Sequence, residues 1–143
     1  MKVLIDTNII LDVLYAREPF VADSSKIFKY CELKQVDGYI SALSIPNIIY
    51  VMRKELDREK VRQVLSTLSN IFSIIDLRGT DLIKAADTDI IDYEDAIQFV
   101  CASRIDADYI VTRNLKDFKD STIPEISPSS FLAELSNEND TSS

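Results

Sequence analysis

Histidine and tryptophan are both absent from this 143-residue chain, and cysteine and glycine occur only twice each. Without histidine the chain has no Ser-His-Asp triad, no HExxH zinc site and no histidine base. Cys31 and Cys101 stand alone, without a CxxC spacing, so we expect them to be reduced, buried thiols. Any catalytic metal should therefore be a hard ion that is held by oxygen ligands.

Long hydrophobic runs are also missing. No apolar segment approaches the roughly 20 residues that span a bilayer, and the N-terminus lacks the features of a secretory signal, so we expect a cytoplasmic protein without membrane contact. The net charge of −8 opposes nonspecific binding to nucleic acid. It does not exclude a nuclease, because carboxylates that bind a divalent cation reverse the local field.

The apolar pattern predicts one domain, residues 1–134, in which strands alternate with helices, followed by a disordered polar tail at 135–143. We expect strands at residues 3–5, 39–41, 72–77, 108–112 and, at a sheet edge because of Pro124, 121–126. We expect helices from about residue 8 and over 24–34, 45–56, 61–72, 81–88 and 92–105, with a last one opening near Pro128. This alternation predicts an α/β fold of three α/β/α layers with a central, mainly parallel sheet of about five strands. Functional sites in such sheets lie at the carboxyl ends of the strands.

Asp6 follows the first expected strand directly, in the segment LIDTN. Aspartate is a favoured N-cap residue, so Asp6 either caps the next helix or holds a metal ion at the strand end. Asn8 and Asp12, one helical turn apart, add polar groups beside it.

A second polar cluster lies in DIIDYEDAIQFVCA. Asp92 and Asp95 are three residues apart and share one helix face. They have the spacing of an approximate capping box, but five acids lie between Asp87 and Asp95, more than a capping box needs. The helix dipole favours the ionised carboxylates that a metal requires.

The third cluster is IVTRNLKDF, where a buried strand leads into a polar loop. The segment is either an ordinary polar turn or part of a site. In the functional interpretation, Thr112 and Asn114 are oxygen donors, Asp117 is a carboxylate, and Arg113 and Lys116 contact phosphate.

Taken in order, the segments VLIDTNIILDVL, DYEDAIQFVCA and DYIVTRNLKDF resemble the PIN-domain family, the nuclease fold of VapC-type toxins. YISALSIPNIIYVMRKEL is similar to the segment that the family places between them, and the resemblance covers about residues 1–134. It implies a PIN-like fold and a metal-dependent endoribonuclease, a hydrolase that uses Mg²⁺ or Mn²⁺ and leaves a 5′-phosphate and a 3′-hydroxyl. It also implies the toxin role of a toxin–antitoxin system, with RNA as substrate, an antitoxin protein as partner, and a homodimer.

Asp6 matches the first acid of the family pattern and Asp95 the third. The second and fourth acids are replaced by Asn47 and Asn114, as in a variant branch of the family that carries a similar TRN and KDF pattern. In this interpretation Asp6, Asp95 and Asp117 are the catalytic and metal-binding carboxylates. Four carboxylates could neutralise two Mg²⁺ ions, and three favour one ion over two. Mg²⁺ commonly binds through one or two carboxylates together with waters and phosphates, so a site with three is compatible with binding. A bound ion would lower the pKa of the water that attacks the phosphodiester.

Asp92 is a further candidate metal ligand, and Asn8, Asn47, Thr112 and Asn114 are supporting polar groups. For Asn47 the sequence leaves another interpretation open. If Ser44 is the N-cap of the helix, Asn47 occupies N3 and has a structural role.

Two other functions are consistent with parts of the sequence. The two asparagines favour a PIN-like domain that has lost catalysis and binds RNA or protein. Asp6 at a strand end also suggests a phosphotransfer nucleophile, but Asn8 occupies the position where haloacid-dehalogenase-type phosphatases usually carry a second aspartate. For base stacking, the sequence offers Tyr15, Phe20 and Tyr93, although most aromatic residues at helical spacing are core.

Overall fold

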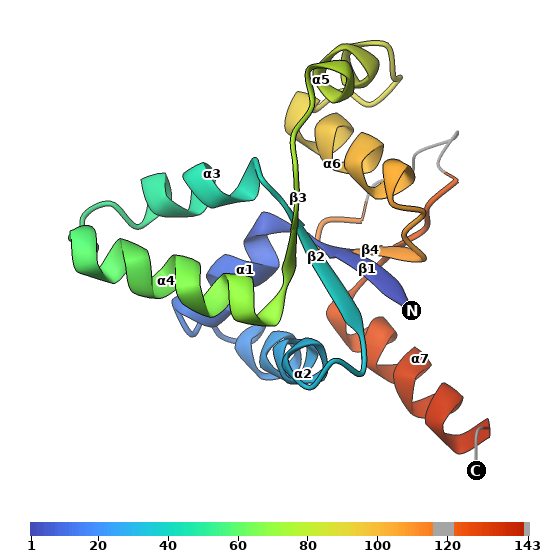
Figure 1. The fold of residues 1–143 in the computed structure, drawn as a ribbon. Coiled ribbons are helices and arrows are strands. Elements are labelled where there is room, and N and C mark those ends of the chain that lie inside the picture. The colour runs from blue at the N-terminus through green and yellow to red at the C-terminus, as the bar shows by residue number, and fades with distance from the viewer. Residues whose placement is uncertain (116–121, 142–143) are drawn as a thin grey trace.

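The computed structural model describes residues 1–115 and 122–141. Its described strands form one parallel sheet in the order β3-β2-β1-β4-β5 (Figure 1). The strands are β1 (Lys2–Ile5), β2 (Asp37–Ser41), β3 (Ser73–Ile75), β4 (Tyr109–Val111) and β5 (Glu125–Ile126). The predicted parallel sheet of about five strands is confirmed, with β5 at one edge.

Helices cover both faces of this sheet (Figure 1). One face is covered by α1 (Thr7–Leu14), α2 (Val21–Glu32), α3 (Ser44–Val51), α4 (Arg58–Ile71) and α7 (Pro128–Thr141). The other is covered by α5 (Gly79–Ala86) and α6 (Tyr93–Arg104). The three-layer α/β/α architecture is therefore confirmed. Among the described residues, no helix combines the length and the apolar character that a membrane span needs.

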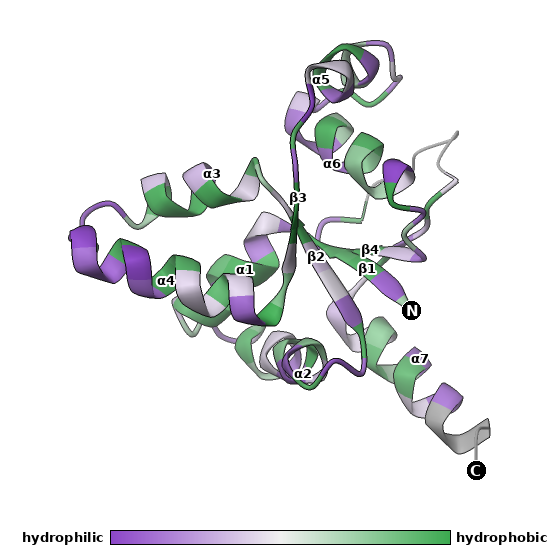
Figure 2. Cartoon of the chain, viewed as in Figure 1, coloured by the Kyte–Doolittle hydropathy of each residue, from purple (hydrophilic) through white to green (hydrophobic). Residues whose placement is uncertain are grey.

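Strand β1 shows why its sequence is continuously apolar. Val3 and Ile5 contribute to the core beneath α1, α2 and α7, whereas Leu4 points to the opposite face, toward α6, and all three side chains are fully buried. A strand that is covered on both faces needs apolar residues at every position. In Figure 2 the hydrophobic colour accordingly lies over the central strands, while hydrophilic residues gather where α3 leads into α4.

Gly38 in β2 packs against Cys31 of α2 and Phe72 at the end of α4. A Cβ atom at this position would lie 2.6 Å from Cys31 Sγ and 2.9 Å from a ring carbon of Phe72. Both neighbours are buried, so neither side chain can move aside freely. The glycine thus allows helix and sheet to pack at this distance.

We expect Gly38→Ala to lower the free energy of unfolding by about 1–3 kcal/mol, the usual cost of overpacking a core. Chemical denaturation measures the change. Gly79→Ala is the matched control, because a Cβ there meets no atom within 4 Å, and a compatible Gly→Ala change is neutral or stabilises by about 0.4–1 kcal/mol. Equal stability of the two variants would contradict the close-packing explanation.

The C-terminal helix differs from its prediction. Helix α7 does begin at Pro128, where Ser127 Oγ accepts a hydrogen bond from the Ser130 N–H at 3.2 Å, but it continues through Thr141 rather than becoming disordered at residue 135. Phe131 and Leu135 anchor its first turns in the core. Once these turns exist, each further residue adds a backbone hydrogen bond without a new nucleation step. The helix therefore extends into a segment that has no apolar periodicity of its own.

The sheet order places β1 at a topological switch point. The chain moves from β1 to β2 and β3 on one side, then returns to pair β4 with the other side of β1. In open parallel sheets, ligands bind in the crevice outside the carboxyl ends of the strands at such a point. Asp6 and Thr112 follow the ends of these two strands.

Candidate active site

Asp6 occupies the N-cap position of α1, but its side chain makes no capping hydrogen bond to that helix. Its Oδ1 instead accepts a hydrogen bond from Gln98 Nε2 of α6 at 3.2 Å, and its Oδ2 accepts one from Thr112 Oγ1 after β4 at 2.9 Å. The carboxylate is therefore held between β1, β4 and α6. The backbone of Asp6 begins the helix while its side chain is directed to the crevice.

Burial raises the pKa of Asp6 above the ordinary aspartate value. The hydrogen bonds from Thr112 and Gln98 oppose this rise, and the negative charge of Asp95 adds to it. The two side-chain donors are neutral, so they orient the carboxylate without cancelling its charge. A partly buried carboxylate beside a second one is an environment that favours a bound cation.

Asp95 reaches the same place from α6. The predicted cap is present at the start of this helix, where Asp92 Oδ1 accepts a hydrogen bond from the Asp95 backbone N–H at 3.0 Å. This bond uses the backbone of Asp95 and not its carboxylate, so capping and a role in a site are compatible. Gln98 lies three residues after Asp95 and therefore on the same helix face, which brings both side chains toward Asp6.

These side chains line an open cleft of about 400 Å³. Of the residues proposed from the sequence, it contains Asp6, Asn8, Asn47, Asp92, Asp95 and Asn114. Its remaining lining residues are Thr7, Leu11, Tyr50, Val51, Glu94 and Gln98. A recess of about 20 Å³, room for one water, adjoins Asp6 and Asp95 and is closed by Thr112, Ile110 and Glu125. The cleft thus combines four segments that are distant in the sequence, around residues 6–11, 47–51, 92–98 and 114.

Asn47 lines the cleft from α3, a helix that starts differently from the sequence expectation. The N-cap of α3 is Leu43, so the interpretation of Ser44 as the cap, with Asn47 at N3, is wrong. The Ser44 hydroxyl has another partner, Thr7 Oγ1, at 2.7 Å. This bond ties the start of α3 to the residue after Asp6, and Asn47 follows on the next turn.

Arg113 and Asp12 form an ion pair below the loop that follows β4. The fully buried Asp12 accepts from Arg113 Nε at 2.8 Å and from Arg113 Nη2 at 3.3 Å, and Arg17 Nη1 contributes at 3.4 Å. The Arg113 guanidinium also lies 4.3 Å from the centroid of the Phe20 ring. Its predicted phosphate contact stays a prediction, as does that of Lys116, which lies with Asp117 outside the described residues.

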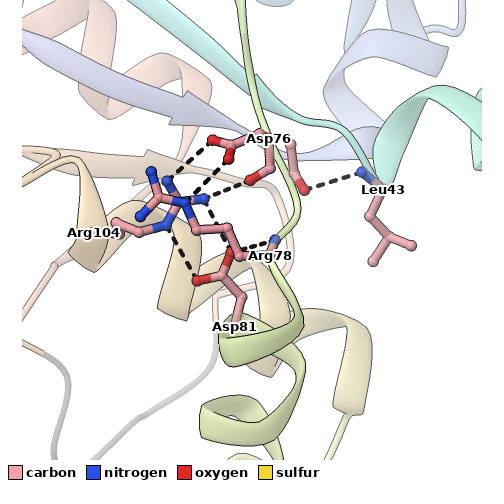
Figure 3. Close-up of polar contacts among 6 residues, drawn as sticks. Leu43, Asp76, Arg78, Asp81 and Arg104 are labelled. Carbon is pink, nitrogen blue, oxygen red and sulfur yellow. Dashed lines mark hydrogen bonds and ion pairs between the residues drawn. The ribbon is translucent and has the colours of Figure 1, made fainter.

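Figure 3 shows a second polar cluster, at the carboxyl end of β3. Arg104 of α6 donates to Asp81 Oδ1 at 3.2 Å and Oδ2 at 3.0 Å, to Asp76 Oδ1 at 3.2 Å and to the Asp76 carbonyl. Arg78 adds a 3.1 Å bond to Asp76. The bonds from Arg78 and Arg104 hold the pKa of Asp76 below its ordinary value. The acids here are neutralised by Arg78 and Arg104, and these ion pairs connect α5 and α6 to the end of β3.

Among the described residues, no three acidic or cysteine side chains lie close enough together to hold a metal ion. The cleft is lined by the carboxylates of Asp6, Asp92, Glu94 and Asp95, of which Asp6 and Asp95 also line the adjoining recess, with amide and hydroxyl oxygens around them. This set fits Mg²⁺ or Mn²⁺, because Mg²⁺ is often bound through one or two carboxylates while keeping several waters.

The sequence analysis did not identify three lining residues, Gln98, Tyr50 and Glu125. Only Gln98 had a signal in the sequence, because it lies three residues after Asp95.

Comparison with known proteins supports this assignment of the fold. A family model described as the PIN domain matches residues 2–116. The chain belongs to the PIN-domain family. No curated protein sequence matches it.

Solved structures of several other proteins have a similar fold. A toxin–antitoxin complex from Klebsiella pneumoniae contains a chain with 22% identity and a TM-score of 0.64, covering 88% of this chain and 97% of that one. VapBC2 from Rickettsia felis, bound to a DNA fragment of its promoter, gives 18% identity and a TM-score of 0.63, with 89% and 98% covered. The toxin VapC20 from Mycobacterium tuberculosis, described as cleaving the sarcin-ricin loop, gives 10% identity and a TM-score of 0.63, with 85% and 95% covered. At these identities the likeness establishes the fold alone.

Proposed function

We propose that this PIN domain is a divalent-metal-dependent endoribonuclease that hydrolyses RNA phosphodiester bonds, as the toxin of a toxin–antitoxin pair. The observation that carries the proposal is the meeting of Asp6 and Asp95 in one open cleft at the switch point of the sheet. Two carboxylates that line one cleft at the strand ends supply the negative charge and the oxygen ligands that a hard divalent cation prefers.

The residues of the cleft suggest how the reaction is supported. Asp6 and Asp95 would hold one Mg²⁺ or Mn²⁺ ion, which supplies an activated water and stabilises charge on the phosphate. Thr112 and Gln98 fix the orientation of the Asp6 carboxylate through one hydrogen bond to each oxygen. Asn8, Asn47 and Asn114 offer neutral oxygens, and Asp92 a further carboxylate at the cleft. Asp117 stays a proposed member of the site.

The structural neighbours support the biological part of the proposal. One is described as a toxin that cleaves the sarcin-ricin loop, and others come from complexes of toxin with antitoxin. An RNA substrate and an antitoxin partner are consistent with these descriptions. The contrasting function is a binding module without catalysis, favoured by the two asparagines, Asn47 and Asn114, that line the cleft in place of the family's acids.

Incubation of the purified protein with a mixed pool of single-stranded RNA tests the proposal. We expect cleavage in Mg²⁺ or Mn²⁺, none in a chelator, and a loss of at least about a hundredfold in Asp95→Asn, since removing a main charge-stabilising group typically costs about 10²–10³ in rate. Product ends should be 5′-phosphate and 3′-hydroxyl. Equal rates for the variant and the unsubstituted protein would indicate a contaminating nuclease, and an intact pool would favour the binding module.

A further inference from the structure

Tyr50 lines the cleft but has no role in the proposed hydrolysis. It lies near the end of α3 and lines the cleft together with Asp6 and Asp95, yet 65% of its surface is exposed. A tyrosine ring has a large apolar surface, and its burial would normally stabilise the fold. An exposed ring in the wall of a candidate active site therefore offers a surface to a ligand.

Arg53 holds this ring in place. Its guanidinium carbon lies 4.1 Å from the centroid of the Tyr50 ring, and its Nη1 donates to the Tyr50 carbonyl at 2.8 Å. A ring whose orientation is already fixed loses less conformational freedom when a ligand stacks on it. The same arginine places a positive charge beside an otherwise acidic cleft, where a polyanionic substrate must approach.

The charge around this pair extends along the same part of the surface. From residue 53 to 62, where α3 leads into α4, five side chains are basic and three are acidic. Figure 2 shows this end of the two helices as a hydrophilic region that projects from the sheet. Backbone phosphates on either side of a bound base would meet a locally positive surface here.

The other candidate aromatics have different roles. The Tyr15 hydroxyl donates to Glu55 Oε2 at 3.3 Å, Phe20 covers the Arg113 guanidinium, and the Tyr93 hydroxyl donates to the Leu82 carbonyl at 2.8 Å. None of these three is among the residues that line the cleft. Tyr50 is thus the aromatic side chain of the described cleft wall.

We propose that Tyr50, supported by Arg53, is the platform on which an unpaired nucleobase of the RNA substrate stacks next to the scissile phosphate. The inference rests on the proposed nuclease function and adds a subsite to it. Stacking requires a free base face, which single-stranded segments provide and duplexes do not. The site would accept any base, because every base has a π-face, so it would select single-stranded RNA without reading its sequence.

Steady-state cleavage of a short single-stranded RNA in Mn²⁺ tests the subsite. We expect Tyr50→Ala to raise KM about tenfold, within the usual range for loss of base–aromatic stacking, with kcat changed less than KM. Tyr50→Phe should behave as the unsubstituted protein, because it keeps the ring. Tyr93→Ala is the matched control, an exposed tyrosine outside the cleft lining, and should leave KM unchanged.

A second measurement reports stacking directly. The chain contains no tryptophan, so 2-aminopurine in the RNA can be excited without interfering protein emission. Rapid mixing should show quenching before cleavage with the unsubstituted protein and Tyr50→Phe, and not with Tyr50→Ala or with Tyr50→Leu, which keeps apolar bulk without a ring. Loss of quenching in both non-aromatic variants supports the inference even if one of them folds poorly.

The two proposals fail in different ways. Metal-dependent cleavage with the same KM and the same quenching in Tyr50→Ala would overturn the stacking subsite and leave the nuclease intact. An unsubstituted protein that neither cleaves RNA nor quenches 2-aminopurine would overturn both.

Discussion

Asp6→Asn is expected to stabilise the metal-free protein while it abolishes RNA cleavage. Burial raises the pKa of Asp6, so the folded chain holds the carboxyl proton more tightly than the unfolded chain does. At neutral pH the ionised carboxylate therefore destabilises the fold. Asparagine removes the charge, and we expect the free energy of unfolding to rise by about 0.5–2 kcal/mol, the usual range of a single stabilising substitution.

The hydrogen bonds of Asp6 are compatible with this change. An asparagine can accept from the Thr112 hydroxyl through its carbonyl oxygen and donate its NH₂ group to Gln98, whose side-chain amide can turn to present its oxygen. The substitution thus removes a charge without leaving a buried donor or acceptor unsatisfied. Activity should fall by at least about a hundredfold, because the amide lacks the charge that holds a divalent cation.

The effect on stability has a defined pH dependence. Below the unfolded aspartate pKa of roughly 3.9, Asp6 is protonated in both states and imposes no penalty. As the pH rises through this value and then through the raised folded pKa, the unsubstituted protein loses stability relative to Asp6→Asn, and at higher pH the difference is constant. Denaturation of both proteins across this range, in a chelator, measures the difference. A smaller free energy of unfolding for Asp6→Asn at neutral pH would contradict the assigned cause.

Two controls complete this test. The chain carries a net charge of −8, so loss of any carboxylate relieves some repulsion. Asp89→Asn, an exposed position outside the cleft lining, measures that general effect. Addition of Mn²⁺ should raise the unfolding midpoint of the unsubstituted protein and of Asp89→Asn but not of Asp6→Asn, since a ligand that binds only the folded state stabilises by about 2.7 kcal/mol at a hundred times its Kd.

The sequence predicted the fold and the strand-end positions of Asp6 and Thr112 for a common physical reason, whereas the pairing of Asp6 with Asp95 was implied by the family resemblance. Strands covered on both faces are recognisable as short apolar runs, and residues at their carboxyl ends must meet because the strands are parallel. Asp6 was ambiguous locally, since an N-cap and a strand-end ligand occupy the same position. The structure separates the two roles, because its backbone starts α1 while its carboxylate bonds to Gln98 and Thr112.

What the sequence did not show are contacts whose partners are distant in the chain. Asp12 was interpreted as a polar group beside the strand end, but it is fully buried and bonds to Arg113, 101 residues away. Serine is a favoured N-cap residue, so Ser44 was interpreted as a helix cap. Its hydrogen bond with Thr7 depends on how α3 packs against α1. Tyr50 lies outside the apolar repeat of its helix, and only the packing of α3 shows that it lines the cleft.

Arg113→Met is expected to lower the free energy of unfolding by about 3–5 kcal/mol, the cost of leaving a buried charge without its partner. Of its ion pairs with the described residues, Asp12 would keep the 3.4 Å contact with Arg17. Urea denaturation measures the change. Arg62→Met is the matched control, since its 3.9 Å pair with Glu59 is largely exposed, and it should change stability by less than about 1 kcal/mol.

The same position discriminates between the two roles considered for Arg113. If it mainly contacts substrate phosphate, Arg113→Lys should keep both stability and activity, because an ammonium is also a phosphate ligand. If Arg113 mainly clamps Asp12, lysine should destabilise the protein nearly as much as methionine does. Lysine has neither the fork of donors that bonds both Asp12 oxygens nor the planar group that stacks on Phe20.

The double variant Asp12→Leu with Arg113→Met should recover most of the lost stability, because an apolar pair replaces a buried ion pair at little net cost. We expect the clamp result, and with it a loss of activity in Arg113→Lys, because Arg113 connects Thr112, the hydrogen-bond donor to Asp6, with Asn114 in the cleft wall.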